Sequence, residues 1–162
     1  MKKTLVLVVA AFALVGCGNA NSSSEGQKTT TTVCSIDKPY ISYSSAKQTI
    51  VSEGDIAKRI EFEGILEAPN KESLDAAIPQ LDEAMKSANS LEGVTATYEK
   101  VNDTTIKDMA EYDLEKASLQ TLQQVGLMKT TEDGQTNEQA KFISVKQSVK
   151  ALEEQGFTCS VE

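Results

Sequence analysis

Histidine is absent from the 162-residue chain, and so is tryptophan. Without histidine, the chain lacks the side chain that most often acts as a general base or a metal ligand near neutral pH. Nucleophilic pairs of serine or cysteine with histidine are therefore excluded. No serine stands in a G-x-S-x-G context, and the phosphate-binding pattern G-x-x-x-x-G-K does not occur. A serine–lysine arrangement stays open on composition alone, but these absences argue against an enzyme and predict no cofactor.

Basic residues are scarce, with 16 lysines and arginines against 24 acidic residues and a net charge of −8. Loss of Lys2 and Lys3 with a cleaved leader would leave 14 basic residues and a net charge of −10. Binding to phosphate groups needs clustered lysine and arginine. We therefore expect neither nucleic acid nor an anionic lipid surface as a partner.

The apolar run TLVLVVAAFALVG, residues 4–16, carries no charge. It is too short to span a bilayer, which takes ~20 residues. A short apolar run that follows Met1, Lys2 and Lys3 is typical of a signal peptide. The alternative is a buried helix of a cytosolic protein.

The residues LVGC, 14–17, resemble the lipobox of bacterial lipoproteins. In those proteins a signal peptidase cuts before the cysteine, which carries the lipid. Two or three acyl chains, each methylene contributing ~0.8 kcal/mol, hold a protein at the membrane almost permanently. The resemblance implies that residues 1–16 are removed and that Cys17 is the lipidation site. It places the protein at the cell membrane, on the extracytoplasmic side, and leaves open which membrane of a two-membrane cell it occupies.

A polar segment rich in Ser, Thr, Asn and Gly follows the lipobox. Such a composition buries too little apolar surface to offset the cost of ordering, so residues 17–30 are predicted to be a flexible, lipidated tether. The folded domain is then residues 31–162. In the alternative, the last three or four residues of the threonine run at 29–32 begin the first strand.

Alternating apolar and polar residues predict several strands with one buried face. In Arg59–Leu66, for example, Ile60, Phe62 and Leu66 face one side. The turns are expected at Glu53–Asp55 and at Asn102-Asp103, the latter as a two-residue hairpin turn. The predicted strands are Val33–Ile36, a segment from Tyr40 towards Val51, Arg59–Leu66, Val94–Glu99, Ile106–Leu114 and Thr158–Val161.

Helical spacing of apolar residues predicts a helix capped by Asn70 and ended by Gly93. Pro79 lies within this pattern, so the helix is either kinked there or restarts there. Two shorter helices are predicted to begin after Ser118 and Ser144. The predicted fold class is α+β, a single antiparallel β-sheet with helices packed on one face.

Taken together, these residues resemble the YehR-type bacterial lipoproteins, also called domain of unknown function 1307. The resemblance covers nearly the whole chain, and it implies this fold and location but no catalytic residues. It is carried by the lipobox ending in Cys17, by SEGD at 52–55, IEF at 60–62, KESLDAAIP at 71–79, TTIKDMAEYDL at 104–114 and VKALEEQGF at 149–157.

Two of the three cysteines, Cys34 and Cys159, are left over once Cys17 carries lipid. An even pair in an exported protein favours a structural disulfide. They stand in the first and the last predicted strand, which would have to be neighbours for the bond to form. Two buried free thiols are the alternative. A redox-active pair is disfavoured, because there is no C-x-x-C motif.

Two groups of carboxylates are candidate metal ligands. Glu61 and Glu63 share one strand face, and EDGQTNE at 132–138 clusters acidic residues with Asn and Gly. A Ca²⁺ site needs six to eight oxygens at fixed spacing, and the EF-hand pattern is not met. We therefore expect a solvated strand face and a polar loop, and no metal site.

The sequence therefore predicts a membrane-anchored extracytoplasmic lipoprotein that is a non-catalytic binding or interaction module. Its partner would be an envelope protein, a peptide or a small ligand. A pocket lined by Tyr40, Tyr43, Tyr98 or Tyr112 would favour this function. The alternative is a structural envelope protein without a ligand, which a closed sheet with a charged outer face would favour.

Overall fold

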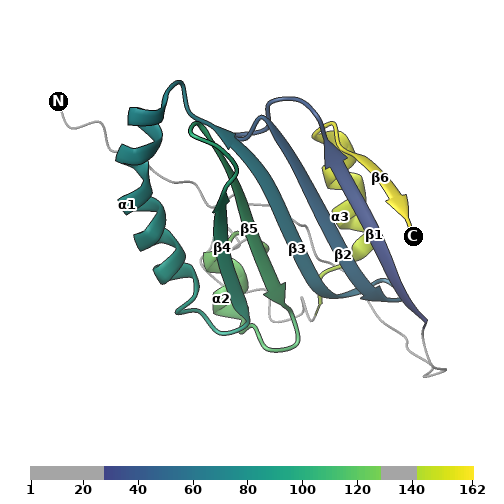
Figure 1. The fold of residues 1–162 in the computed structure, drawn as a ribbon. Helices are drawn as coiled ribbons and strands as arrows, with labels where there is room; N and C mark the ends of the chain where they lie inside the picture. The colour runs from purple at the N-terminus through teal and green to yellow at the C-terminus, as the bar shows by residue number, and fades with distance from the viewer. Residues whose placement is uncertain (1–27, 129–141) are drawn as a thin grey trace, which may run out of the picture.

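The alternating segments of the sequence form the strands of a single sheet. The computed structural model describes residues 28–128 and 142–162. Within these ranges six strands form one antiparallel sheet in the order β4-β5-β3-β2-β1-β6, accompanied by three helices (Figure 1). The predicted α+β fold class is confirmed. The elements are β1 (Thr29–Ile36), β2 (Ser45–Glu53), β3 (Ile56–Glu67), α1 (Lys71–Ala88), β4 (Val94–Lys100), β5 (Thr105–Asp113), α2 (Leu119–Gln124), α3 (Val145–Glu154) and β6 (Thr158–Val161).

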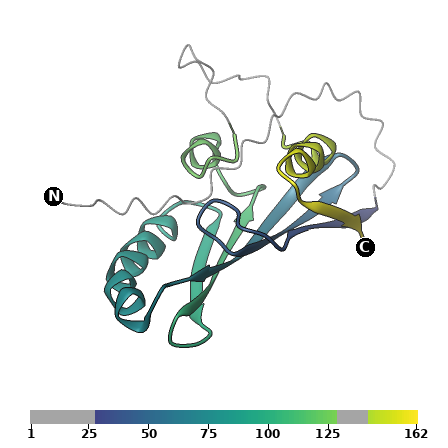
Figure 2. The ribbon, with the colours of Figure 1, turned by 90° about the horizontal axis from the view of Figure 1, so that it is seen from above.

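One face of the sheet is buried. On β3, Ile60 and Phe62 belong to this inner face, and their partners on the two neighbouring strands extend the same layer. Helices α2 and α3 lie over this side of the sheet, and α1 lies beside β4 (Figure 2). None of the described helices is long and apolar enough to cross a membrane. The partners of Ile60 are Ile50 and Tyr112, and those of Phe62 are Gln48 and Ala110.

Apolar side chains gather in two clusters. The larger one lies between the central strands and helices α2 and α3, and includes Ile60 and Leu152. In the smaller one, Leu74 and Leu81 of α1 pack against Ile106 of β5. Ile106 pairs with Leu66 of β3. Leu66 lies two residues from Gly64 and four from Phe62 along the strand, so these residues share one face, and α1 covers the same face as the other helices. Helices therefore cover only the inner face, as the sequence predicted.

Helix α1 begins as predicted, since the side chain of Asn70 accepts a hydrogen bond of 2.8 Å from the Ser73 N–H. The helix continues through the exposed Pro79 without a break, so a second helix does not start there. It ends at Ala88, earlier than predicted. The predicted end, Gly93, instead lies in the turn before β4 with φ +76°, and a Cβ there would lie 2.6 Å from the backbone N of Ala117.

Three local predictions need correction. Tyr40–Tyr43 is a tight turn rather than the start of a strand, because the backbones of Tyr40 and Tyr43 exchange two hydrogen bonds of 2.9 Å across Ile41, which has φ +54°. Strand β2 begins only at Ser45. The β4–β5 connection spans residues 101–104 and is not a two-residue turn, since the Asn102 side chain accepts from the Thr104 N–H and extends the loop.

Strand β1 begins at Thr29, so the predicted tether ends before Thr29, and the alternative in which the threonine run begins the first strand is confirmed. Thr29 pairs with Glu53, next to the predicted turn at Gly54, which has φ +59°. The chain therefore enters the domain at the end of the sheet where β2 turns into β3.

Candidate functional sites

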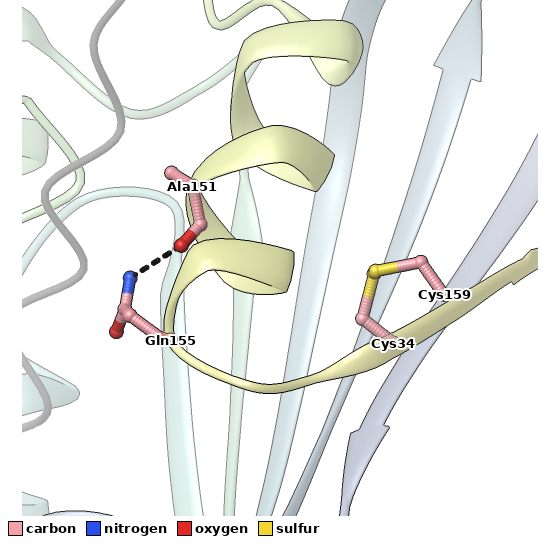
Figure 3. The surroundings of a disulfide bond; sticks show 4 residues. All are labelled: Cys34, Ala151, Gln155 and Cys159. Atoms are coloured by element: carbon pink, nitrogen blue, oxygen red, sulfur yellow. Dashed lines mark hydrogen bonds between the residues drawn. A yellow bond between two sulfur atoms is a disulfide. The ribbon is translucent and has the colours of Figure 1, made fainter.

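Cys34 and Cys159 form a disulfide bond between the first and the last strand (Figure 3). They face each other in the β1–β6 register with their Cα atoms 4.0 Å apart, although 125 residues separate them in sequence. Cys34 is fully buried. The bond lies near the end of α3, where the side-chain amide of Gln155 donates to the Ala151 carbonyl at 3.0 Å (Figure 3). A buried bond of this kind is structural in character, because reactive cysteines are exposed.

The predicted lipidation site, Cys17, lies outside the described residues, as do the predicted leader and residues 18–27 of the predicted tether. The same is true of the acidic segment 132–138 that was considered as a Ca²⁺ loop. Lipidation of Cys17 and a polar loop without a metal at 132–138 stay predictions from the sequence.

The carboxylates on the outer face of the sheet are engaged in ion pairs. Glu63 lies between Lys47, at 2.6 Å, and Lys107, at 2.7 Å. Hydrogen bonds from these two ammonium groups lower the pKa of the Glu63 carboxyl. Glu61 pairs with Arg59 at 3.0 Å. Within residues 28–128 and 142–162, no group of three or more acidic or cysteine side chains is arranged to hold a metal ion. This face is therefore a solvated surface crossed by ion pairs.

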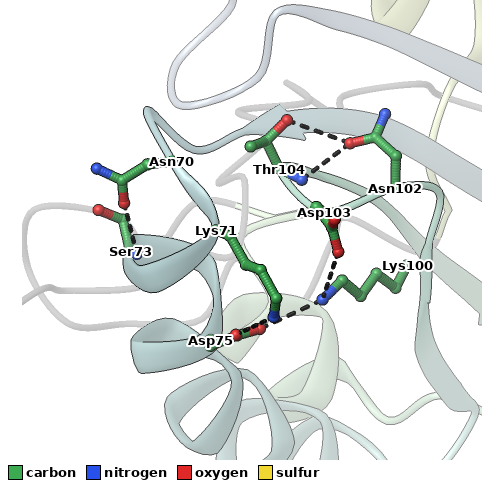
Figure 4. Close-up of polar contacts among 8 residues, drawn as sticks. All are labelled: Asn70, Lys71, Ser73, Asp75, Lys100, Asn102, Asp103 and Thr104. Atoms are coloured by element: carbon green, nitrogen blue, oxygen red, sulfur yellow. Dashed lines mark hydrogen bonds and ion pairs between the residues drawn. The ribbon is translucent and has the colours of Figure 1, made fainter.

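A second network of ion pairs joins the start of α1 to the β4–β5 connection (Figure 4). Lys71 pairs with Asp75 one turn along the helix, and Lys100 of β4 reaches Asp75 at 3.2 Å and Asp103 at 3.9 Å. All four side chains are substantially exposed, so each pair is worth at most ~1 kcal/mol. The network fixes the position of the helix and resembles no ligand site.

The hollows formed by residues 28–128 and 142–162 that are described below have no tyrosine in their lining. Tyr40, Tyr43 and Tyr112 are buried. The Tyr40 hydroxyl donates to the Gln155 side chain at 2.7 Å, and that of Tyr98 donates to Asp82 at 2.8 Å. Burial raises the pKa of Tyr112 to about 12. None of these rings lines a described hollow.

Tyr43 makes the most buried polar contact among the tyrosines. Its hydroxyl donates to Asp108 at 2.6 Å, and its ring lies over Gly64, where a Cβ would be only 2.5 Å from a ring carbon. Burial raises the pKa of the Asp108 carboxyl, although the hydrogen bond from Tyr43 opposes this. Burial also raises the pKa of Tyr43, and the nearby Asp108 charge adds to the effect. Because Gly64 makes the space for the ring, the sequence could not reveal this arrangement.

A cleft of about 280 Å³, lined mostly by residues of apolar type and called the apolar cleft below, opens where three segments meet. The first residues of β3 bond to both of the others: the Ala57 N–H donates to the Ile143 carbonyl and the Leu114 N–H donates to the Lys58 carbonyl, each at 2.9 Å. Nine of the eleven lining residues are apolar, and the two others are Lys58 and Glu115. The lining residues are Ile56, Ala57, Lys58, Leu114, Glu115, Ala117, Leu119, Leu122, Met128, Phe142 and Ile143.

Charged groups stand together at this cleft. The Lys58 ammonium lies 3.0 Å from Glu115 and 3.3 Å from Glu53. Hydrogen bonds to these two carboxylates raise the pKa of Lys58. Lys58 occupies a β-bulge, because Val51 pairs with Arg59 and the next residue, Ser52, with Ala57. The bulge leaves Lys58 without a partner on β2. One ammonium thus serves two carboxylates, and the group carries one surplus negative charge.

A wider hollow of about 500 Å³ lies at the other end of β1, between Asp37 and Thr158. Its lining is mostly polar, and Lys38 occupies the space over Gly156, where a Cβ would lie 2.7 Å from the Lys38 Nζ. Ligand sites are usually apolar hollows with a few polar groups. The smaller apolar cleft meets that description better.

Sequence reasoning missed the role of Asp55. Its carboxylate accepts hydrogen bonds from the Ser144 hydroxyl at 2.8 Å and from the Lys146 N–H at 2.9 Å, and its carbonyl accepts from the Val145 N–H. Asp55 thereby caps α3 together with Ser144, the predicted cap. The two residues are 89 positions apart, so no local pattern signals the contact.

The fold places the protein in the α+β class, as a domain whose single antiparallel sheet carries helices on one face. No protein-family model and no curated protein sequence matches the chain. Two solved structures share its fold. The NMR structure of YehR from E. coli matches with a TM-score of 0.60 and 21% identity, over 83% of this chain and 93% of YehR. The NMR structure of a protein from Streptococcus pneumoniae matches with a TM-score of 0.58 and 16% identity, over 91% of this chain and 94% of that one.

The resemblance to the YehR-type proteins is thus confirmed at the level of the fold. The link to domain of unknown function 1307 stays a prediction. Neither structure is named for an activity, a ligand or a partner. Function must therefore be argued from the sites of this chain.

Proposed function

We propose that this protein is a lipid-anchored, extracytoplasmic and non-catalytic binding module, whose binding site is the apolar cleft at the start of β3. The observation that carries the binding role is the cleft itself. Nine apolar residues and two charged residues line its volume of about 280 Å³. An apolar hollow with few polar groups is the usual form of a small-ligand site.

Two observations support the location. The lipobox at residues 14–17 implies lipid on Cys17, and the Cys34–Cys159 bond is of a kind that persists in oxidising compartments outside the cytoplasm. The chain also enters the sheet at the same end as the β2–β3 turn and the cleft. The tether would therefore hold the cleft end of the domain nearer to the membrane.

A non-catalytic role is supported by the cleft chemistry. Lys58 and Glu115 are its two titratable lining groups, and they are paired with each other. A nucleophile needs a base positioned beside it, and the described part of the lining contains no serine, threonine or cysteine for that role.

The alternative function, a structural envelope protein without a ligand, is favoured by a different observation. The outer face of the sheet carries ion pairs such as Lys47 with Glu63, and the hydroxyls of Tyr40, Tyr43 and Tyr98 are used within the domain. Such a protein would leave the cleft without an occupant.

Mass spectrometry of the protein isolated from its native membrane tests the location. We expect a mature chain that starts at Cys17 with added acyl mass, and a gain of about two daltons on reduction as the single disulfide opens. An unprocessed chain without lipid would refute the anchor, and the absence of a mass gain would refute the extracytoplasmic disulfide.

Ligand binding tests the cleft. The protein isolated from its membrane and held in lipid nanodiscs is titrated with 4-phenylbutanol, a soluble neutral probe, and amide shifts are followed by NMR. We expect shifts around Leu119 that Leu119→Gln weakens severalfold. The matched control is Val101→Gln, because Val101 is an exposed apolar residue that does not line the cleft. An absence of shifts, or equal effects of both variants, would favour the structural alternative.

A further inference from the structure

The volume of the cleft limits the size of its ligand. A closed cavity of ~150 Å³ accepts benzene, which suggests on the order of ten carbons for a cleft of about 280 Å³. Nine of the eleven lining residues are apolar, so their side chains offer a ligand no hydrogen bonds. A ligand must therefore offer a compact apolar body and keep its polar group where Lys58 and Glu115 stand.

The charges at the cleft determine which polar group of a ligand is favoured. Glu53 and Glu115 share the single ammonium of Lys58, so their combined charge is −1. Lys58 is already engaged by both carboxylates, and an incoming anion would have to compete with them. The side chain of Glu115 is 67% exposed, so it keeps room for a second cationic partner. Charge complementarity therefore disfavours a carboxylate or phosphate and favours a cation.

We propose that the cleft binds a small cationic amphiphile, namely an aryl- or alkylamine with roughly ten carbons, whose ammonium group pairs with Glu115. This inference rests on the proposed binding function and names its ligand class. The apolar body fills the space beside Leu119 and Leu122, and the amine stays at the charged group, where it brings the net charge of that group to zero.

Three probes with one apolar body test the proposal: 4-phenylbutylamine, 4-phenylbutanol and 4-phenylbutyrate. Each is titrated into the protein in nanodiscs at low salt, with empty nanodiscs as the blank, and dissociation constants are taken from amide shifts of cleft residues. We expect the amine to bind about fivefold more tightly than the carboxylate, the range that partly exposed ion pairs allow. The alcohol should lie between them.

Glu115→Gln should reduce the preference for the amine to less than about twofold while the alcohol binds as before, because the variant removes charge without changing shape. The matched control is Glu111→Gln, which removes an exposed glutamate of the outer face. It should leave the preference unchanged. Raising the salt concentration should weaken the amine preference and spare the alcohol.

The outcomes separate the two proposals. If all three probes bind equally well, or if Glu115→Gln leaves the amine preference intact, the ligand class is wrong while the binding function stands. If no probe shifts the cleft residues, both the ligand class and the binding function are overturned.

Discussion

At the scale of single residues, Tyr43 and Asp108 show how a buried polar contact depends on its surroundings. The ring of Tyr43 lies on Gly64, and its hydroxyl donates to a carboxylate that is largely removed from water. A carboxyl whose pKa is raised in the folded state destabilises the fold at pH values above that pKa. This cost disappears as the pH falls through the raised pKa and the group takes up a proton.

We expect Tyr43→Phe to lower the free energy of unfolding by about 1–3 kcal/mol at pH 7, because the Asp108 charge loses its donor. The hydrogen bond from Tyr43 lowers the Asp108 pKa, so its removal raises that pKa further. The loss should therefore shrink as the pH is lowered from 7 to 4, because Asp108 takes up a proton more readily in the variant. Urea unfolding at both pH values measures this.

Tyr98→Phe is the control for that experiment, because Tyr98 donates to Asp82 in an exposed contact. It should change stability by less than ~0.5 kcal/mol. A loss for Tyr43→Phe that is equal at both pH values would contradict the coupling to Asp108.

Gln48 is a second residue whose environment conflicts with its chemistry. Its side chain is fully buried between Cys34 and Phe62 of the neighbouring strands, and neither polar atom of the amide has a hydrogen-bond partner. Leaving buried polar atoms unpaired costs ~1–3 kcal/mol.

We expect Gln48→Met, which has a similar volume and no amide, to raise the free energy of unfolding by about 1 kcal/mol. Thermal or urea unfolding measures the change, and Gln120→Met on the exposed side of α2 is the control. A lower stability of Gln48→Met would instead mean that the amide holds a buried water.

At the scale of elements, side chains outside a helix or strand satisfy backbone groups that the element itself leaves unpaired. Asn89, just after α1, is an example. Its side-chain amide donates to the Ala96 carbonyl and accepts from the Ala96 N–H, both at 2.8 Å. These bonds occupy backbone groups at the edge of the sheet that a strand of another molecule could otherwise pair with.

The start of α3 offers the clearest test at this scale. Asp55→Ala removes the acceptor for the Lys146 N–H and for the Ser144 hydroxyl. We expect a loss of about 1–2 kcal/mol, the usual cost of a lost helix cap, together with faster hydrogen exchange in the first turn of α3. Urea unfolding and amide exchange measure these effects.

The control is Asp37→Ala, which removes an exposed aspartate after β1 and should change stability by less than ~0.5 kcal/mol. Exchange in α3 that is unchanged by Asp55→Ala would show that Ser144 alone suffices as the cap.

At the scale of the whole molecule, the Cys34–Cys159 bond closes nearly the entire domain into one loop. The chain-entropy treatment gives an upper limit of about 4–5 kcal/mol for a loop of this length. We expect reduction, or replacement of both cysteines by serine, to lower the free energy of unfolding by about 2–4 kcal/mol. The comparison is urea unfolding with and without a reductant.

Ser160→Ala is the matched control, since it changes an exposed residue of β6 beside the disulfide and leaves both cysteines in place. Its stability in solution should equal that of the unchanged domain. Equal stability of the oxidised and reduced protein would show that the sheet holds β6 in place without the bond.

Residues that act on their near neighbours could be predicted from the sequence. Asn70, Ser118 and Ser144 are caps because each side chain accepts a bond from an N–H three residues on. The buried face of β3 could be predicted from its alternating apolar and polar residues, because successive side chains of a strand point to opposite faces. The prediction of a strand at Tyr40–Tyr43 is wrong. Its aromatic residues have high strand propensity, but the backbones of Tyr40 and Tyr43 close a turn.

The sequence by itself determined the kinds of element, their caps and the pair of cysteines available for a bond, because these depend on spacing along the chain. Only the tertiary structure decided which strands are neighbours. The order of the strands in turn produces three features: the capping of α3 by Asp55, the packing of the Tyr43 ring on Gly64, and the cleft at Lys58. Each of these joins segments that are far apart in sequence. Their contact depends on the order of strands in the sheet and on space left by a glycine or a bulge, which no local pattern records.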